Sequence, residues 1–500
     1  MQRVNSTTGE TVFRMLPHHL RQDETCMQDL TPEPLSPTSS LGGRPLRQVF
    51  LDSVQYALGG LAYKAIALIS VPILARLVSP AELGLLDLAV IVALVVSGLG
   101  TLGLETALAR MDAEAPDPDV WASAGVVMVA GLLLGGLVGA VLSVPLSSVL
   151  LADSEHAGVI ASGVLYGCVL GACTMGLNIV RLRSRPRRYA TYGFIIVLGE
   201  MAGALTLAAL GAPVPVIVMG WVLASAIGTA VLFVREHPPV GRPSLAMVKR
   251  LLAFGAPLVP ATLVWILADV AVRSTVGRDL GLDAMGLYGI ALRIASVLTL
   301  IVAGFALAWH PFLYRSGATE VRDLAHQAAI RLSAALGALA IVLASLAPEV
   351  VTVVAGPRYA GAATVVPALA LGATLFGMVT LSAAVLGVDF NTRVLAIASA
   401  VGAAIQVVGS ALLIDRVGLV GAGAATALGY GVTLAAVALK ARLPVGRVGL
   451  QLVVVIAVLV VLTMLGEMPA WVRISAGLGG LLLLATATVI SPRRVTDRSN

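Results

Sequence analysis

Fourteen apolar stretches follow one another between about residues 52 and 490, separated only by short polar loops. Each holds about 20 residues, and a helix of that length crosses a hydrocarbon core of about 30 Å. A helix of a water-soluble domain needs a polar face, which these stretches lack. The pattern therefore predicts an all-α polytopic membrane protein. The expected spans are approximately 54–78, 83–108, 121–144, 157–181, 191–210, 213–234, 252–276, 285–311, 326–347, 361–387, 394–414, 417–439, 449–466 and 471–490.

The composition excludes several classes of function. Charged residues make up 12% of the chain, whereas about 25% is usual in soluble domains. No loop is long enough for a separate catalytic domain. The sequence contains no phosphate-binding loop, no His-Glu-x-x-His motif and no paired-cysteine spacing, so we expect no ATPase activity, no catalytic residues, no metal and no cofactor. The net charge of +6 does not indicate nucleic acid, because the basic residues flank apolar stretches.

The distribution of basic residues predicts the topology. Residues 181–188 carry five arginines, and alternate loops carry almost none. About three quarters of the 33 Lys and Arg residues fall on one side of the expected spans. Since positive loops stay on the cytoplasmic side, both termini are expected in the cytoplasm, in a cytoplasmic membrane crossed many times. An even number of spans agrees with that placement.

A short repeat predicts the domain organisation. Gly84-Leu85 and Gly286-Leu287 are 202 residues apart and take the same position relative to their spans. Because six spans return a chain to its starting side, the repeat predicts two parallel six-helix lobes with a central substrate site. We expect a disordered cytoplasmic tail, two lobes, two additional helices and a second tail, at residues 1–48, 49–235, 250–442, 447–490 and 491–500.

Four segments, in this order, carry a resemblance to a known family. They are Pro72–Gly84, Ala268–Asp269 with Gly286–Ala295, Gly356–Ala362 and Leu413–Thr426. Together they resemble the bacterial oligosaccharide flippases, the polysaccharide-transporter branch of the multidrug/oligosaccharidyl-lipid/polysaccharide exporter superfamily. The chain departs from the family in span eleven, where Asn residues are common and this chain has Gln406, Gly409 and Ser410. It also departs in span seven, where Arg273 stands four residues after Asp269 instead of next to it.

The resemblance implies a transporter and not an enzyme. Such a flippase moves a polyprenyl-diphosphate-linked oligosaccharide from the cytoplasmic to the outer leaflet by alternating access, for a surface polysaccharide such as lipopolysaccharide or exopolysaccharide. Its implied partners are this lipid-linked substrate, membrane lipids, and a polysaccharide polymerase and glycosyltransferases. A cavity lined by cations would neutralise the diphosphate while the lipid tail stays in the bilayer.

Charged residues inside the expected spans are the candidate functional residues, because each costs about 2.5–3.5 kcal/mol at the centre of a bilayer. Lys64 and Glu200 lie mid-span at similar depth. In the second half, Asp269 and Arg293 also lie at matched depth, about seven or eight residues from the external ends of their spans. Each couple is either a structural ion pair or part of the cavity. In the cavity, Lys64 and Arg293 would bind the substrate phosphates, and Asp269 and Glu200 would serve as charge partners or coupling acids.

Two further charges each have two interpretations. Arg273 lies near the outer end of its span, where it would bind substrate or extend to the interface. Glu105 lies near the end of span two, opposite to Asp87 at the other end. We expect both acids at the interface, with Glu105 as a further candidate for the mouth of the cavity or for coupling.

Other functions remain open at this stage. A lipid II flippase-like protein and a small-molecule or ion antiporter belong to the same superfamily, but an exporter of cationic drugs would favour cavity acids over Lys64 and Arg293. A membrane glycosyltransferase or polymerase would need a larger external loop. A scaffold without transport would not need charges within its spans.

Overall fold

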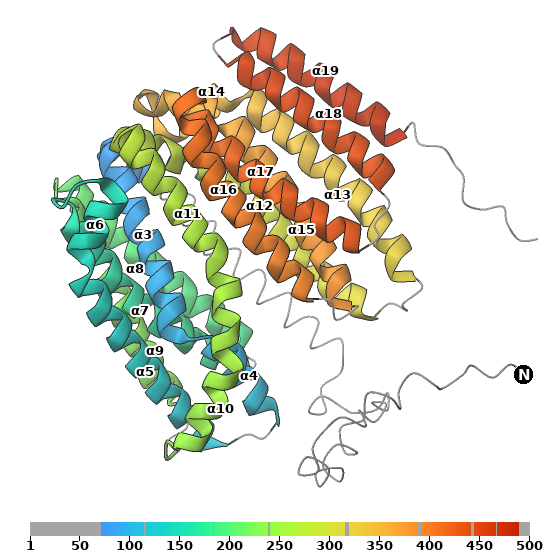
Figure 1. Ribbon diagram of the computed structural model, residues 1–500. Helices are drawn as coiled ribbons and strands as arrows, with labels where there is room; N and C mark the ends of the chain where they lie inside the picture. Colours follow the sequence, from blue (N-terminus) through green and yellow to red (C-terminus); the bar gives the residue numbers. More distant parts are fainter. Residues whose placement is uncertain are drawn as a thin grey trace, which may run out of the picture. The chain divides into compact units, whose positions relative to one another are not determined.

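The computed structural model describes residues 72–114, 117–183, 185–238, 241–315, 320–388, 392–441, 445–466 and 468–489. The regular secondary structure of these residues is entirely helical (Figure 1), which confirms the all-α prediction. Both expected tails, most of the first expected span and Lys64 lie outside the described residues.

In the first half of the chain, the helices are α3 (Pro80–Thr101), α4 (Leu104–Glu114), α5 (Pro118–Val141), α6 (Ser143–Leu151), α7 (Ala157–Leu182), α8 (Pro186–Ala209), α9 (Val214–Glu236) and α10 (Leu245–Gly255). The second half contains η4 (Ala256–Leu258), α11 (Val259–Asp279), α12 (Leu282–Arg315), α13 (Glu320–Ser345), α14 (Ala347–Ala355), η5 (Pro357–Thr364), α15 (Val366–Val388), α16 (Thr392–Val417), α17 (Leu419–Lys440), α18 (Val445–Met464) and α19 (Ala470–Val489).

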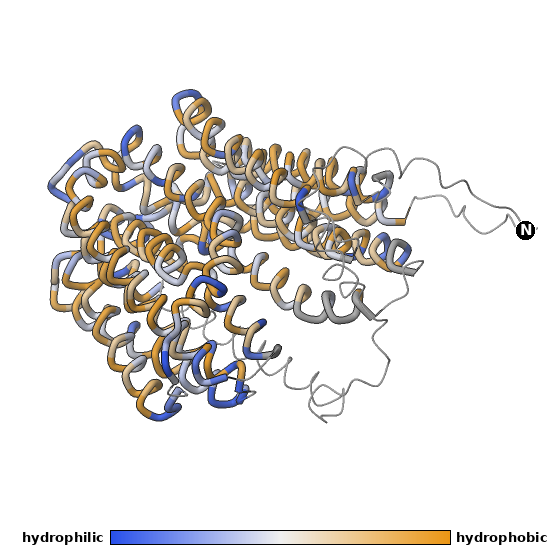
Figure 2. Tube along the Cα trace, turned by 60° about the horizontal axis from the view of Figure 1, so that its bottom comes forward, coloured by the Kyte–Doolittle hydropathy of each residue, from blue (hydrophilic) through white to orange (hydrophobic). Residues whose placement is uncertain are grey.

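Twelve of the helices in the described ranges are long and apolar enough to cross a membrane. A thirteenth crossing is formed if Leu245–Leu258 and Leu263–Asp279 make one span, bent by 52°. The expected span at 252–276 is therefore a bent segment, in which Pro257 and Pro260 remove backbone donors. Figure 2 shows hydrophobic residues along the helices and hydrophilic residues mainly at their ends.

Side chains in the polar loops cap the first turns of the helices. Before α3, Ser79 accepts a hydrogen bond from the Glu82 amide, and Glu82 accepts one from the Ser79 amide. This capping box satisfies amide groups that a helix leaves unpaired at its first turn. Proline then occupies the first turn of α3, as it does in α5, α8 and α9.

Helix packing follows the same order in the two halves of the chain. Helix α3 packs on α7, α7 on α9, and α8 on α9. When 202 is added to their residue numbers, α3, α7, α8 and α9 overlap with α12, α15, α16 and α17. The corresponding pairs also pack together: α12 on α15, α15 on α17, and α16 on α17. This correspondence supports the parallel repeat, while the boundaries at 49–235 and 250–442 stay predictions.

The two C-terminal helices pack against α13. Gln451 of α18 is fully buried and bonds on both sides: it accepts from the Ser333 hydroxyl at 2.6 Å and donates to the Thr488 hydroxyl at 2.9 Å. These bonds join α18 to α13 and to α19. Satisfied polar groups of this kind fix one packing arrangement between otherwise apolar helices.

Candidate functional site

The two glycines of the sequence repeat lie against each other where α3 meets α12. A Cβ on Gly84 would lie 2.9 Å from the Leu282 carbonyl oxygen, and one on Gly286 would lie 2.6 Å from the Pro80 carbonyl carbon. No larger side chain fits this approach of two backbones. The glycine of each repeated Gly-Leu pair thus forms the contact between the first helical turns of α3 and α12.

Further along the same two helices, an ion pair joins them. Arg293 Nη1 of α12 donates to Asp87 Oδ2 of α3 at 2.9 Å, and Arg293 Nη2 donates to Asp87 Oδ1. Asp87 is 7% exposed, so the carboxylate is buried between helices, while its position at the membrane interface stays a prediction. The expected couple of Asp269 and Arg293 is not what the structure shows, because Arg293 binds Asp87 with both terminal nitrogens. Such a bidentate pair is specific in geometry as well as charge.

Three more hydrogen bonds are made by the start of α3 and the residues just before it. Asp283 Oδ1 accepts from the Ala81 amide at 3.1 Å and so caps α3 from the start of α12. The Tyr359 hydroxyl of η5 donates to the Val78 carbonyl at 3.2 Å. Burial raises the pKa of Tyr359, which keeps this phenol in its donating form. Arg76 Nη2 donates to the Val353 carbonyl at 3.0 Å. The bonds of Tyr359 and Arg76 thus hold the residues before α3 to η5 and α14. We call the contacts between α3 and α12 themselves, which are the two glycines, Ala81–Asp283 and Asp87–Arg293, the α3–α12 closure.

Asp269 belongs to a second polar group, on α11, α12, α16 and α17. Its Oδ1 accepts from Gln406 Nε2 at 3.2 Å, and the same amide lies 3.3 Å from the Thr426 hydroxyl. Thr426 also contacts the Tyr288 hydroxyl at 3.2 Å. The departure from the family pattern at Gln406 therefore provides the hydrogen-bond donor for Asp269.

Arg273 lies beside Asp269 without a hydrogen bond to it. Arg273 Nη1 is 4.0 Å from Asp269 Oδ2, and the Arg273 side chain is 13% exposed. Its Nε and Nη1 atoms are buried and have no hydrogen-bond partner among the described residues. A buried donor without a partner is costly, so the surroundings of these two nitrogens call for an explanation.

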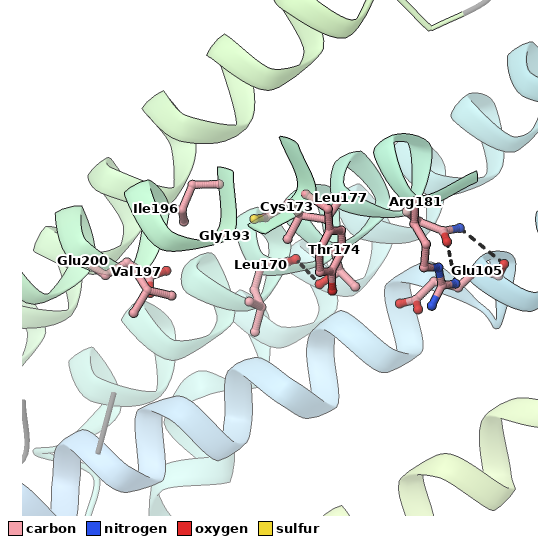
Figure 3. A pocket seen from close by; sticks show the side chains of 12 residues that line it. Glu105, Leu170, Cys173, Thr174, Leu177, Arg181, Gly193, Ile196, Val197 and Glu200 are labelled. Carbon is pink, nitrogen blue, oxygen red and sulfur yellow. Dashed lines mark hydrogen bonds between the residues drawn. The ribbon is translucent and has the colours of Figure 1, made fainter. Parts of the chain in front are cut away.

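The remaining candidate acids line a small cavity in the first half of the chain (Figure 3). Its volume is about 170 Å³, and Glu105 and Glu200 lie at its two ends. Glu200 Oε1 accepts from the Tyr166 hydroxyl at 3.0 Å and also from the Ser225 hydroxyl. The structure therefore gives Glu200 hydroxyl partners from α7 and α9, whereas its expected partner Lys64 lies outside the described residues. At the Glu105 end, Arg181 Nη2 donates to Asn178 Oδ1.

An apolar groove lies on the other half of the chain, between α15, α17 and α18. Its volume is about 800 Å³. The lining includes Leu371, Met378, Leu428, Val432, Leu452 and Ile456. Nothing in the sequence pattern distinguishes these positions from other apolar helix faces. The groove can therefore be recognised only in the tertiary structure.

The described candidate charges are partly buried, and the structure gives several of them partners other than the expected ones. Arg273 and Asp269 are brought together, and Glu105 and Glu200 share one cavity. Arg293 forms its ion pair with Asp87. No group of three metal-binding side chains occurs in the described ranges.

Comparison with known proteins places this arrangement in a class. The solved lipid II flippase MurJ, in an inward closed conformation, is similar with a TM-score of 0.67 over 87% of this chain and 98% of that chain, at 11% identity. An inward-facing multidrug resistance MATE family transporter of the MOP superfamily has a TM-score of 0.60 over 77% of this chain and 94% of its own, at 17% identity. A mutant of the Vibrio cholerae MATE transporter VcmN has a TM-score of 0.57 over 79% and 96%, at 14% identity. The fold is thus the one these transporters share.

The family follows from a sequence model. Residues 73–364 match the family described as polysaccharide biosynthesis protein, and the chain belongs to this family. That match confirms the assignment implied by the four resembling segments. No curated protein matches the chain.

Proposed function

We propose that the protein is a flippase for a polyprenyl-diphosphate-linked oligosaccharide, which it moves from the cytoplasmic to the outer leaflet of the cytoplasmic membrane. The family, polysaccharide biosynthesis, and the shared transporter fold support the general class. A diphosphate and a polar glycan cannot cross hydrocarbon unaided, so a carrier for them must supply buried cations and an apolar path for the tail.

Arg273 carries this proposal. Two of its nitrogens are buried and unpaired among the described residues, beside an acid that is itself held by Gln406. The planar guanidinium can donate two hydrogen bonds to one phosphate, which is why arginine is suited to this ligand. Asp269, 4.0 Å away, limits the cost of the buried cation while no phosphate is bound.

The apolar groove between α15, α17 and α18 supplies the path for the tail. Its 800 Å³ falls in the range of ligand sites, and its lining side chains are nearly all apolar. A polyprenyl chain in this groove would keep contact with the protein and with the bilayer while the phosphates are held elsewhere.

The other candidate residues receive separate roles. Arg293 binds Asp87 in the conformation described, so we assign it first to the α3–α12 closure and to phosphate only after that pair opens. Lys64 stays a candidate phosphate ligand on sequence grounds. Glu200, supported by Glu105 in the same cavity, is our candidate for the coupling acid, because its hydroxyl partners can hold the carboxyl group in either protonation state.

The test is translocation in proteoliposomes that contain the full chain and a fluorescent polyprenyl-diphosphate oligosaccharide. A membrane-impermeant hydrolase measures the fraction of substrate on the outer side. We expect Arg273→Gln to reduce the initial rate at least tenfold, since a charged hydrogen bond is worth about 1.5–3 kcal/mol. Arg278→Gln is the matched control, because Arg278 is on the same helix and bonds to the carbonyl of the exposed Val149.

The outcomes separate the alternatives. Unchanged translocation by Arg273→Gln would contradict the assigned phosphate site. Faster movement of lipid II than of longer lipid-linked oligosaccharides would favour a lipid II flippase-like function. Transport of small cations with no movement of either lipid would favour an antiporter.

A further inference from the structure

A long furrow runs between α8 and α9, apart from the residues given roles above. Its volume is about 1160 Å³. Small residues form its floor, where the backbones approach: a Cβ on Gly203 would lie 3.1 Å from the Gly220 carbonyl oxygen. Exposed apolar side chains form its walls, and Ile195, Leu223 and Ile227 are each more than half exposed.

Most of the furrow lies on another side of α8 and α9 from Glu200, although Ile196 lines both the furrow and the cavity that holds Glu200. Residues on a helix are about 100° apart, so Ile195, five positions before Glu200, points to a different side of α8. The same holds on α9, where Ser225 contacts Glu200 while Leu223 and Ile227 line the furrow. In a membrane-spanning chain, exposed apolar walls on this side meet lipid.

Arginines stand at one end of the furrow. Arg188 and Arg235 are both lining residues and both exposed. Glu236 next to them is buried and faces three arginines: it accepts from Arg185 at 2.9 Å and from Arg188 at 3.1 Å, with Arg183 at 3.8 Å. One carboxylate cannot neutralise three guanidinium groups and the adjacent Arg235. The mouth of the furrow therefore keeps a net positive charge.

We propose that this furrow binds a membrane phospholipid with an anionic headgroup. The phosphate would lie at Arg188 and Arg235, and one acyl chain would lie along the glycine floor. From Arg188 to Leu207 the furrow follows α8 for about 28 Å at 1.5 Å per residue. A leaflet is half of a core of about 30 Å, so the furrow is long enough for a full acyl chain. The site is distinct from the transport site and does not depend on the proposed function.

The test is native mass spectrometry of the purified full chain titrated with phosphatidylglycerol or phosphatidylcholine of identical acyl chains. We expect stronger binding of phosphatidylglycerol. Arg235→Gln should weaken its binding about fivefold, the factor that corresponds to about 1 kcal/mol for one basic residue near an anionic surface, and should leave phosphatidylcholine unchanged. Ala202→Phe, at an exposed position in the furrow, should weaken both lipids by filling the acyl path.

Arg187→Gln is the matched control. Arg187 is exposed in the first turn of α8, next to Arg188, and carries the same charge, but it does not line the furrow. An equal loss from Arg187→Gln and Arg235→Gln would show diffuse attraction and overturn the site. Equal binding of the two phospholipids would also overturn it, as would displacement of phosphatidylglycerol by a polyprenyl phosphate at equal concentration.

Discussion

Removal of the Arg293 guanidinium should open the α3–α12 closure. In Arg293→Gln, Asp87 would keep its charge at 7% exposure and lose both donors of its bidentate pair. Removing one partner of a buried ion pair costs about 3–5 kcal/mol, because the other charge is left uncompensated. Arg293 is 26% exposed, so solvent screens part of the interaction and the lower figure applies.

The cost falls on one conformation. When α3 and α12 separate, Asp87 regains water, so only the closed state loses the roughly 3 kcal/mol. At 1.36 kcal/mol for each factor of ten, the population of the closed state relative to the open state should fall about 10²-fold. The free energy of unfolding should change less than the free-energy difference between the closed and the open state.

Cross-linking measures the closed state directly. The three natural cysteines are first replaced by serine. Ala81→Cys and Asp283→Cys then place one thiol on α3 and one on α12, at the positions whose amide and carboxylate are hydrogen-bonded in the structure. A short bismaleimide should join them rapidly in this variant and at least tenfold more slowly with Arg293→Gln added. The double variant Asp87→Asn/Arg293→Gln should recover most of the rate, because two neutral amides can still bond.

Two results would refute the reasoning. One is an unchanged cross-linking rate in Arg293→Gln. The other is a failure of the double variant to cross-link faster than Arg293→Gln alone, which would mean that the buried charge on Asp87 is not the cause. Arg278→Gln serves as the control, since Arg278 bonds to Val149 and takes no part in this contact.

Two further predictions concern the same contact and Glu200, the acid that we propose for coupling. Gly286→Val should slow the same cross-linking at least tenfold although the ion pair is intact, because a side chain at this position meets the Pro80 backbone. An unchanged rate would show that the two backbones can separate at little cost. Glu200→Gln should preserve folding, since the amide oxygen still accepts from Tyr166, but should abolish the response of translocation to an imposed pH gradient in proteoliposomes. Exposed Glu155→Gln is the control, and a retained response in Glu200→Gln would remove Glu200 from coupling.

The amino-acid sequence by itself determined that the chain is a helical membrane protein, because hydropathy over about 20 residues is a local property that needs no knowledge of packing. It also identified the unusual residues, since a charge within an apolar span is visible one position at a time. The repeated Gly84 and Gly286 could be found by their spacing, but the spacing did not say that these two glycines touch.

The partners of the charges were decided only by the tertiary structure. Arg293 and Asp269 lie in consecutive spans at similar depth, so proximity along the chain suggested a pair. The structure instead joins Arg293 to Asp87, 206 residues away, and Asp269 to Gln406, 137 residues away. Which face of a helix a charge occupies, and which helix stands opposite, depends on side-chain packing across the whole bundle. Local sequence sets the depth of a charge, whereas the arrangement of helices sets its partner.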